Sequence, residues 1–147
     1  MDRYDYMKAA IELAHIAADK GEVPVGCVVV KDGAIIAQAH NLSKTLKNPL
    51  KHAETLAIEG ACNILKTDNL SGCELYVTLE PCPMCAGAIV NAKISKVVFG
   101  AFDINYGACG SAINLLNLPK NFKPEYYGGI CEDECSNILT EFFDKLR

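Results

Sequence analysis

The sequence lacks any long apolar run. None approaches the roughly 18 uninterrupted apolar residues that a membrane-spanning helix needs, so no membrane partner is expected. The first residues, Met1 to Asp5, lack the basic and then apolar layout of a signal peptide, which predicts a cytoplasmic protein. Internal repeats, low-complexity segments and domain linkers are also missing. With 147 residues, half of them apolar, we expect one domain over residues 1–147 with a single sizeable core.

An excess of basic residues is lacking too. The net charge of −4 argues against a broad surface for nucleic acid, because non-specific affinity comes mainly from lysines and arginines that neutralise phosphates. The charges are nevertheless uneven. Lys44, Lys47 and Lys51 lie in the acid-free stretch between Asp32 and Glu54. Taken alone, this pattern is typical of ordinary solvated lysines.

Eight cysteines are present, and without an export signal the reducing cytosol favours free thiols or metal ligands over disulfides. Most of them lack a partner motif and are interpreted as small buried apolar residues with no assigned role. Cys131 and Cys135 lie four apart on one helix face and are expected to pack rather than bind metal. The residues without an assigned role are Cys27, Cys62, Cys73, Cys109, Cys131 and Cys135.

Hydrophobic periodicity and turn residues predict helices alternating with strands after an opening hairpin around Asp32-Gly33. The stretch 101–124 is rich in Gly and Asn and is expected to be irregular. This order implies an α/β fold, a three-layer α/β/α sandwich with a mixed central sheet of about five strands. The predicted helices are 4–20, 53–65, 85–91 and 132–146, and the predicted strands are 26–30, 34–39, 74–78 and 96–100.

Cys82 and Cys85 open a helix that follows a strand, in the sequence Glu80-Pro81-Cys82-Pro83-Met84-Cys85. A helix N-terminus favours thiolate over thiol, so both sulfurs are placed to bind one metal ion. A Cys-x-x-Cys pair alone is equally typical of a redox disulfide. His52-Ala53-Glu54, which opens another predicted helix, favours the metal.

Three protein ligands, His52, Cys82 and Cys85, leave a fourth position open, as in catalytic zinc sites. The expected cofactor is therefore Zn²⁺, one per subunit. Zinc lowers the pKa of bound water to about 7, which supplies hydroxide for attack at neutral pH. Glu54, unliganded beside the metal, is the expected catalytic proton shuttle between the water, a ring nitrogen and the departing ammonia.

His52-Ala53-Glu54 with Pro81-Cys82-x-x-Cys85 resembles the signature of the zinc nucleobase deaminases. The resemblance covers nearly the whole chain. In particular, the chain resembles the bacterial tRNA adenosine deaminases, which convert the wobble adenosine of an anticodon to inosine. Its further matches are Glu22-Val23-Pro24-Val25-Gly26, Asn41, Val77-Thr78-Leu79-Glu80, Phe99-Gly100-Ala101-x-Asp103, Gly107-Ala108-x-Gly110-Ser111, Glu134-Cys135 and Phe142-Phe143.

This resemblance implies a cytidine-deaminase-like fold, a homodimer, and zinc-hydroxide attack at C6 of an adenosine flipped out of a tRNA anticodon stem-loop, with no DNA partner. It also implies that Asn41 and the backbone of Ala53 bind the substrate nucleoside, and that Asp103 lies beside the RNA strand.

Two other functions stay open from the sequence. One is deamination of a free base or nucleoside such as guanine or cytosine, which needs the same zinc chemistry but no strand-binding surface. The other is a zinc-stabilised or redox-active binding module without turnover, in which Glu54 would have no use beside the metal. Asp103 also has a plain alternative, because an Asp after a strand often caps a turn.

Overall fold

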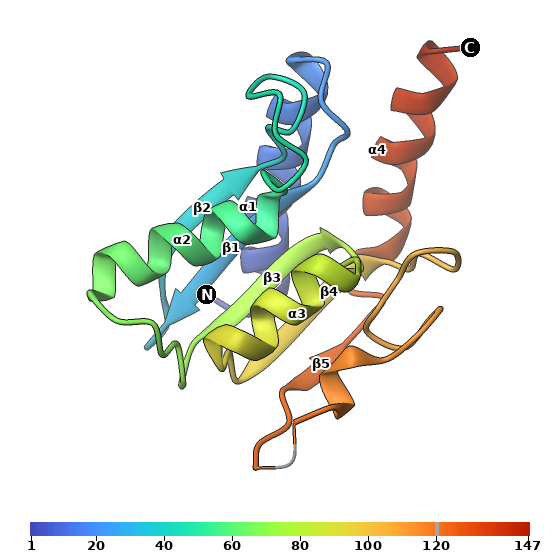
Figure 1. The fold of residues 1–147 in the computed structure, drawn as a ribbon. Helices are drawn as coiled ribbons and strands as arrows, with labels where there is room; N and C mark the ends of the chain where they lie inside the picture. The colour runs from blue at the N-terminus through green and yellow to red at the C-terminus, as the bar shows by residue number, and fades with distance from the viewer. Residues whose placement is uncertain (120) are drawn as a thin grey trace.

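A mixed sheet forms the centre of the protein in the computed structural model, which describes residues 1–119 and 121–147 (Figure 1). Its strands are β1 (Gly26–Lys31), β2 (Ala34–His40), β3 (Glu74–Leu79), β4 (Lys96–Ala101) and β5 (Glu125–Tyr127), in the spatial order β2-β1-β3-β4-β5. β1 pairs antiparallel with β2 and β3, whereas β3, β4 and β5 run parallel. The predicted mixed sheet of about five strands is confirmed.

Helices cover both faces of this sheet. They are α1 (Arg3–Asp19), α2 (Ala53–Leu65), α3 (Pro83–Ala92) and α4 (Glu132–Lys145), with one 3₁₀ turn, η1 (Leu115–Asn117). Side chains alternate along β1: Cys27 and Val29 pack in the core under α2 and α3, and Val28 packs in the core under α1 and α4. The three-layer α/β/α sandwich is as predicted, but it has two cores rather than the single core expected, because the sheet separates the apolar residues of its two faces.

The hairpin between β1 and β2 turns at Asp32 and Gly33, whose φ angles are 51° and 78°. A two-residue turn with positive φ at both positions matches the right-handed twist of the flanking strands. The predicted hairpin is therefore present, and it places β2 at the edge of the sheet.

β5 is a strand that the sequence pattern does not predict. It has three residues, all exposed, and they pair with Lys96, Val97 and Val98 of β4. A strand this short carries no alternating apolar pattern, so its existence depends on pairing with a distant segment.

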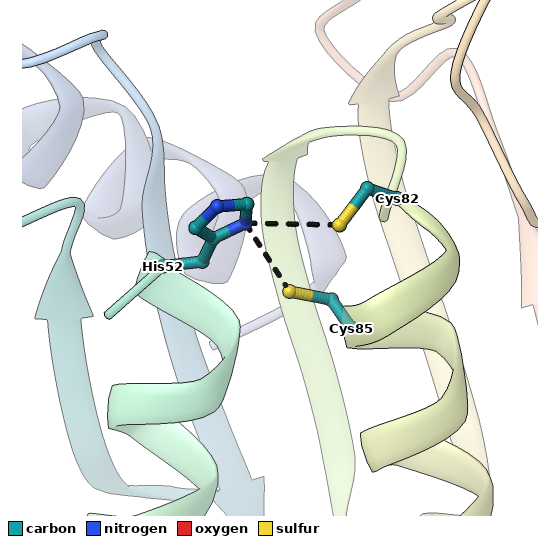
Figure 2. Close-up of side chains that lie close together, drawn as sticks. All are labelled: His52, Cys82 and Cys85. Carbon is teal, nitrogen blue, oxygen red and sulfur yellow. Dashed lines mark hydrogen bonds between the residues drawn. The ribbon is translucent and has the colours of Figure 1, made fainter. Parts of the chain in front are cut away.

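α2 and α3 lie side by side on the same face of the sheet, and their first turns come close together (Figures 1 and 2). The two segments that carry the candidate metal ligands thus meet at one end of the sandwich. Within the described part of the chain, the length and apolar character that crossing a membrane requires are not combined in any helix.

Candidate active site

His52 and Cys82 are the residues that precede the first turns of α2 and α3. Both have extended backbone, with φ and ψ of −78° and 160° at His52 and −73° and 172° at Cys82. Neither side chain caps its own helix, so each is free to turn toward the other helix. Pro83 fits the first helical position because the missing N–H would have no partner there.

The three predicted ligand side chains converge on one point, as Figure 2 shows. His52 Nδ1 lies 3.7 Å from Cys82 Sγ and 3.6 Å from Cys85 Sγ. The three ligand atoms all lie within 4.8 Å of one another, and among the described residues this is the one His, Cys, Asp or Glu cluster of that kind. These residues could hold a metal ion, and Cys85 is the fully buried member of the three.

Hydrogen bonding within the cluster makes one sulfur strongly acidic. The Cys85 thiol and then the His52 imidazole bond to the Cys82 sulfur, which lowers the pKa of Cys82 to about 4. The bond to Cys82, followed by desolvation, raises the pKa of Cys85. His52 has a raised pKa, chiefly because it bonds to Cys82. A thiolate in contact with an imidazole is the donor chemistry that a divalent zinc-like metal favours.

Glu54 lies in the first turn of α2 with 4% of its surface exposed. Desolvation is the main cause that raises its pKa to about 7. The cluster of possible metal ligands consists of His52, Cys82 and Cys85, and that Glu54 stays unliganded beside a bound metal remains a prediction. A buried carboxyl group beside a cluster of possible metal ligands is suited to proton transfer.

A pocket of about 580 Å³ opens over this cluster. Its size falls in the range of small-molecule sites, and its walls are mostly apolar with a few polar groups. Six of the seven predicted site residues line it, and the seventh, Cys85, lies behind them. The six are Asn41, His52, Ala53, Glu54, Cys82 and Asp103.

Asn41 and Ala53 present hydrogen-bonding groups at the pocket wall. The Asn41 side chain donates to the Val23 carbonyl at 3.4 Å and accepts from the Ser43 N–H at 3.2 Å. An amide has two N–H groups, so one remains for a ligand. Ala53 is fully buried at the first position of α2, where a backbone N–H has no partner within the helix. Both positions suit substrate binding, which stays a prediction.

Asp103 follows β4 at the mouth of the pocket. Its Oδ1 accepts from the Tyr106 N–H at 3.0 Å, so the carboxylate does cap a turn. Its other oxygen accepts no hydrogen bond within the described part of the chain. The turn-capping role and a contact with substrate are thus compatible, and the contact with RNA stays a prediction.

Two buried carboxylates without a predicted role hold the loops at the pocket walls. Glu22 is fully buried and accepts from the N–H groups of Lys44 and Thr45. Glu80 is 2% exposed and accepts several hydrogen bonds from the loop that carries Asp103. The available signal was that both acids stand in segments that carry the family resemblance, Glu22-Val23-Pro24-Val25-Gly26 and Val77-Thr78-Leu79-Glu80, although local spacing gave neither a role.

The remaining cysteines and aromatics take ordinary positions. Cys135 is buried in the core beneath α1 and α4, as expected, and Cys131 packs against that core. Phe142 is buried, whereas its neighbour Phe143 is 43% exposed.

Comparison with known proteins finds similarity to deaminases, which matches the geometry of this site. The MafB19-like deaminase family matches residues 1–147. The tRNA-specific adenosine deaminase of Bacillus subtilis is 52% identical over 143 residues, which cover 97% of this chain and 89% of that protein. The chain belongs to the tRNA-specific adenosine deaminase family. The expected resemblance and the expected class of enzyme are thereby confirmed.

Solved structures of deaminases have the same fold as this chain. One from work on A-to-I editing by tRNA:A34 deaminases at the wobble position of transfer RNA has a TM-score of 0.89 and 40% identity, covering 93% of this chain and all of that one. The guanine deaminase of Bacillus subtilis has a TM-score of 0.67 and 34% identity, covering 82% and 88%. The expected cytidine-deaminase-like architecture is confirmed, and the tRNA-acting deaminase is the nearer of these two.

Proposed function

We propose that this deaminase hydrolyses adenosine to inosine at the wobble position of tRNA anticodons. The observation that carries the proposal is the convergence of His52, Cys82 and Cys85 beside the buried Glu54 in a nucleoside-sized pocket. The Bacillus subtilis relative that is 52% identical over 143 residues is a tRNA-specific adenosine deaminase. The reaction adds water at C6 of the purine, breaks the bond to the exocyclic nitrogen and releases ammonia.

The ligand spacing fits zinc. Bonds of about 2.0–2.1 Å to nitrogen and 2.3 Å to sulfur place the two atoms about 3.6 Å apart in a tetrahedron. The separations of 3.7 and 3.6 Å from His52 Nδ1 to the two sulfurs agree with that edge. When bound, zinc supplies Lewis acidity that lowers the pKa of a coordinated water to about 7. We propose one zinc per chain, held by His52, Cys82 and Cys85.

Glu54 moves the protons in this proposal. Its buried carboxyl group lies in the first turn of α2, two residues after His52, and lines the pocket. It takes a proton from the attacking water and passes it to the purine ring nitrogen next to C6. It then takes the proton of the hydroxyl group now on C6 and gives it to the exocyclic nitrogen, which leaves as ammonia while the C6 carbonyl forms. Asn41 and the Ala53 N–H hold the nucleoside so that C6 faces this carboxyl group.

A second groove favours a substrate larger than a nucleoside. It has a volume of about 520 Å³ and shares Val23, Leu79 and Asp103 with the first pocket. Its other walls include Phe102 and Phe143, which are 47% and 43% exposed. Exposed aromatic rings stack on unpaired bases, so a flexible RNA loop can continue from the pocket along this groove.

A free base is the alternative substrate, favoured by the likeness to guanine deaminase. Incubation of purified protein with total tRNA, adenosine, guanine and cytosine, with products identified by mass, separates the two functions. Inosine in tRNA with little product from the free bases supports the proposal. Xanthine as the main product would refute it, and Glu54→Gln protein provides the background.

We further propose a cytoplasmic homodimer, in which both subunits use the same surface for contact. Light scattering at micromolar concentration is expected to give twice the mass of a chain of 15.9 kDa. A monomer under those conditions would contradict the assembly and leave the chemistry of the pocket unaffected.

A further inference from the structure

The loop between β4 and η1 forms one rim of the candidate active site and carries Asp103 and Tyr106, which both line the pocket. Tyr106 is 68% exposed, and the first part of the loop contributes no residue to either hydrophobic core, whereas Ala108 and Cys109 further along are buried in the core under α2 and α3. An exposed loop can recognise a substrate only if other contacts hold its backbone in one conformation. We propose that Glu80 is a positioning residue that fixes this loop, and with it Asp103 and Tyr106, for binding of the RNA. The inference rests on the proposed function.

The Glu80 carboxylate is the hydrogen-bond centre of the loop. Oε1 accepts from the Asp103 N–H at 3.1 Å and from the Ser111 hydroxyl. Oε2 accepts from the N–H groups of Cys109 and Ser111, both at 3.1 Å. Each oxygen thus accepts two bonds, and within the described residues Glu80 has no cationic partner. One buried side chain ties three points of the loop together.

The surrounding backbone is shaped to this carboxylate. The Ala108 N–H donates to the Pro81 carbonyl at 2.8 Å, which fastens the loop to the residue after Glu80. At Gly107 a Cβ atom would overlap the Glu80 carboxyl group and the Asp103 carbonyl. The loop can close over Glu80 only because a glycine stands there.

Glu80 also connects the loop to the segment that carries a candidate metal ligand. It lies two residues before Cys82, so the segment that holds the first sulfur ligand also holds the loop. Through Oε1 it fixes the backbone of Asp103, whose side chain in turn accepts from the Tyr106 N–H. A loosened loop would therefore weaken substrate binding more than the reaction of bound substrate.

Glu80→Gln tests this role because it keeps the shape and replaces one acceptor oxygen by an NH₂ group. That group would face N–H donors and leave a buried donor without an acceptor. The matched control is Glu22→Gln, which makes the same change at a buried carboxylate that holds the opposite loop through Lys44 and Thr45. Ser111→Ala removes one of the four bonds and serves as the milder variant.

We expect Glu80→Gln to raise KM for an anticodon stem-loop about tenfold, as for loss of a hydrogen bond to a charged group, with kcat changed less than about threefold. Zinc per chain should stay unchanged, and Ser111→Ala should shift KM the same way by a smaller factor. Asp103→Asn should raise KM in the wild type and in Glu22→Gln protein. In Glu80→Gln protein it should add less than about twofold, because that side chain is already misplaced.

Full persistence of the Asp103→Asn effect in Glu80→Gln protein would overturn the positioning role. An unchanged KM in both Glu80→Gln and Ser111→Ala proteins would do the same, as would a silent Asp103→Asn in active wild-type enzyme. Wild-type protein that ignores the stem-loop but deaminates guanine is a different result: it refutes the proposed function first, and the positioning role with it.

Discussion

Burial and hydrogen bonding act in opposite directions on the two acidic groups nearest the candidate metal. Desolvation raises the pKa of Glu54 to about 7, whereas bonds from Cys85 and His52 lower the pKa of Cys82 to about 4. The sulfur is therefore prepared as an anionic ligand, and the carboxyl group is kept able to carry a proton. This division of roles separates a catalytic site from a purely structural one.

Replacing Glu54 by glutamine separates proton transfer from metal binding. Glu54→Gln keeps the size of the side chain and leaves His52, Cys82 and Cys85 in place. We expect one zinc per chain in the variant, no loss of thermal stability, and a fall in kcat by about 10² to 10⁴, the usual contribution of general acid–base catalysis. Metal analysis and inosine formation measure both effects. Substantial remaining activity would remove Glu54 from the mechanism.

Removing a sulfur ligand should have the opposite pattern. Cys85→Ser is expected to release most of the zinc, to abolish turnover and to lower the melting temperature, since metal binding stabilises the folded state. Cys73→Ser is the matched control, because Cys73 is also fully buried but lies outside the ligand cluster. Equal zinc contents in the two variants would contradict the assigned ligand set.

At the level of single residues, candidate site residues could be predicted from the sequence where they stand close together in a short motif. His52 and Glu54 stand in one motif and Cys82 and Cys85 in another, and each motif opens a predicted helix, so their side chains were expected to meet. Glu80 was out of reach, because its four bonds come from residues 23 to 31 positions later. Three of the four come from backbone N–H groups, which every residue except proline carries, so residue type does not reveal them.

Among the elements, the long periodic segments were predictable and the short paired ones were not. The helix over residues 53–65 was predicted with its observed bounds, because apolar residues recur at helical spacing. β5 was missed because its three exposed residues become a strand only by pairing with β4. The irregular stretch 101–124 contains η1 and the loop around Glu80, whose order comes from long-range bonds.

The loop after β4 gives a prediction at this scale. Gly107→Ala would place a methyl group against the Glu80 carboxyl group and the Asp103 carbonyl. We expect a loss of about 1–3 kcal/mol in the free energy of unfolding, typical of overpacking, measured by urea denaturation. Gly60→Ala in α2 is the control, since its Cβ would meet only Ala37 at ordinary contact distance. That change should stabilise by about 0.5–1 kcal/mol. A Gly107→Ala protein with an unfolding free energy no lower than that of the wild type would contradict this, because the loop would then accommodate the methyl group without cost.

For the whole molecule, the question is how a chain with a net charge of −4 binds a polyanion. The charge of the residues near the pocket matters more for this than the net charge of the whole chain. The acid-free stretch before Glu54 carries Lys44, Lys47 and Lys51. Lys44 is exposed and its Nζ lies 5.9 Å from the centre of the Phe142 ring, which brings α4 and the loop after Asn41 together. A cation stands beside the pocket despite the acidic average.

Salt dependence tests whether that cation contacts phosphate. Each phosphate neutralised on single-stranded nucleic acid adds about 0.7 to the slope of log affinity against log salt. We expect 1/KM for an anticodon stem-loop to fall with salt in the wild type, and Lys44→Gln to reduce that slope by about 0.7. Lys66→Gln is the control, because Lys66 follows the last turn of α2, about 20 Å from the ligand end of the helix by its 13-residue length. An unchanged slope in Lys44→Gln protein would show that this lysine only packs on Phe142. Equal reductions in the two variants would instead indicate attraction by the overall charge, without a defined path for the strand.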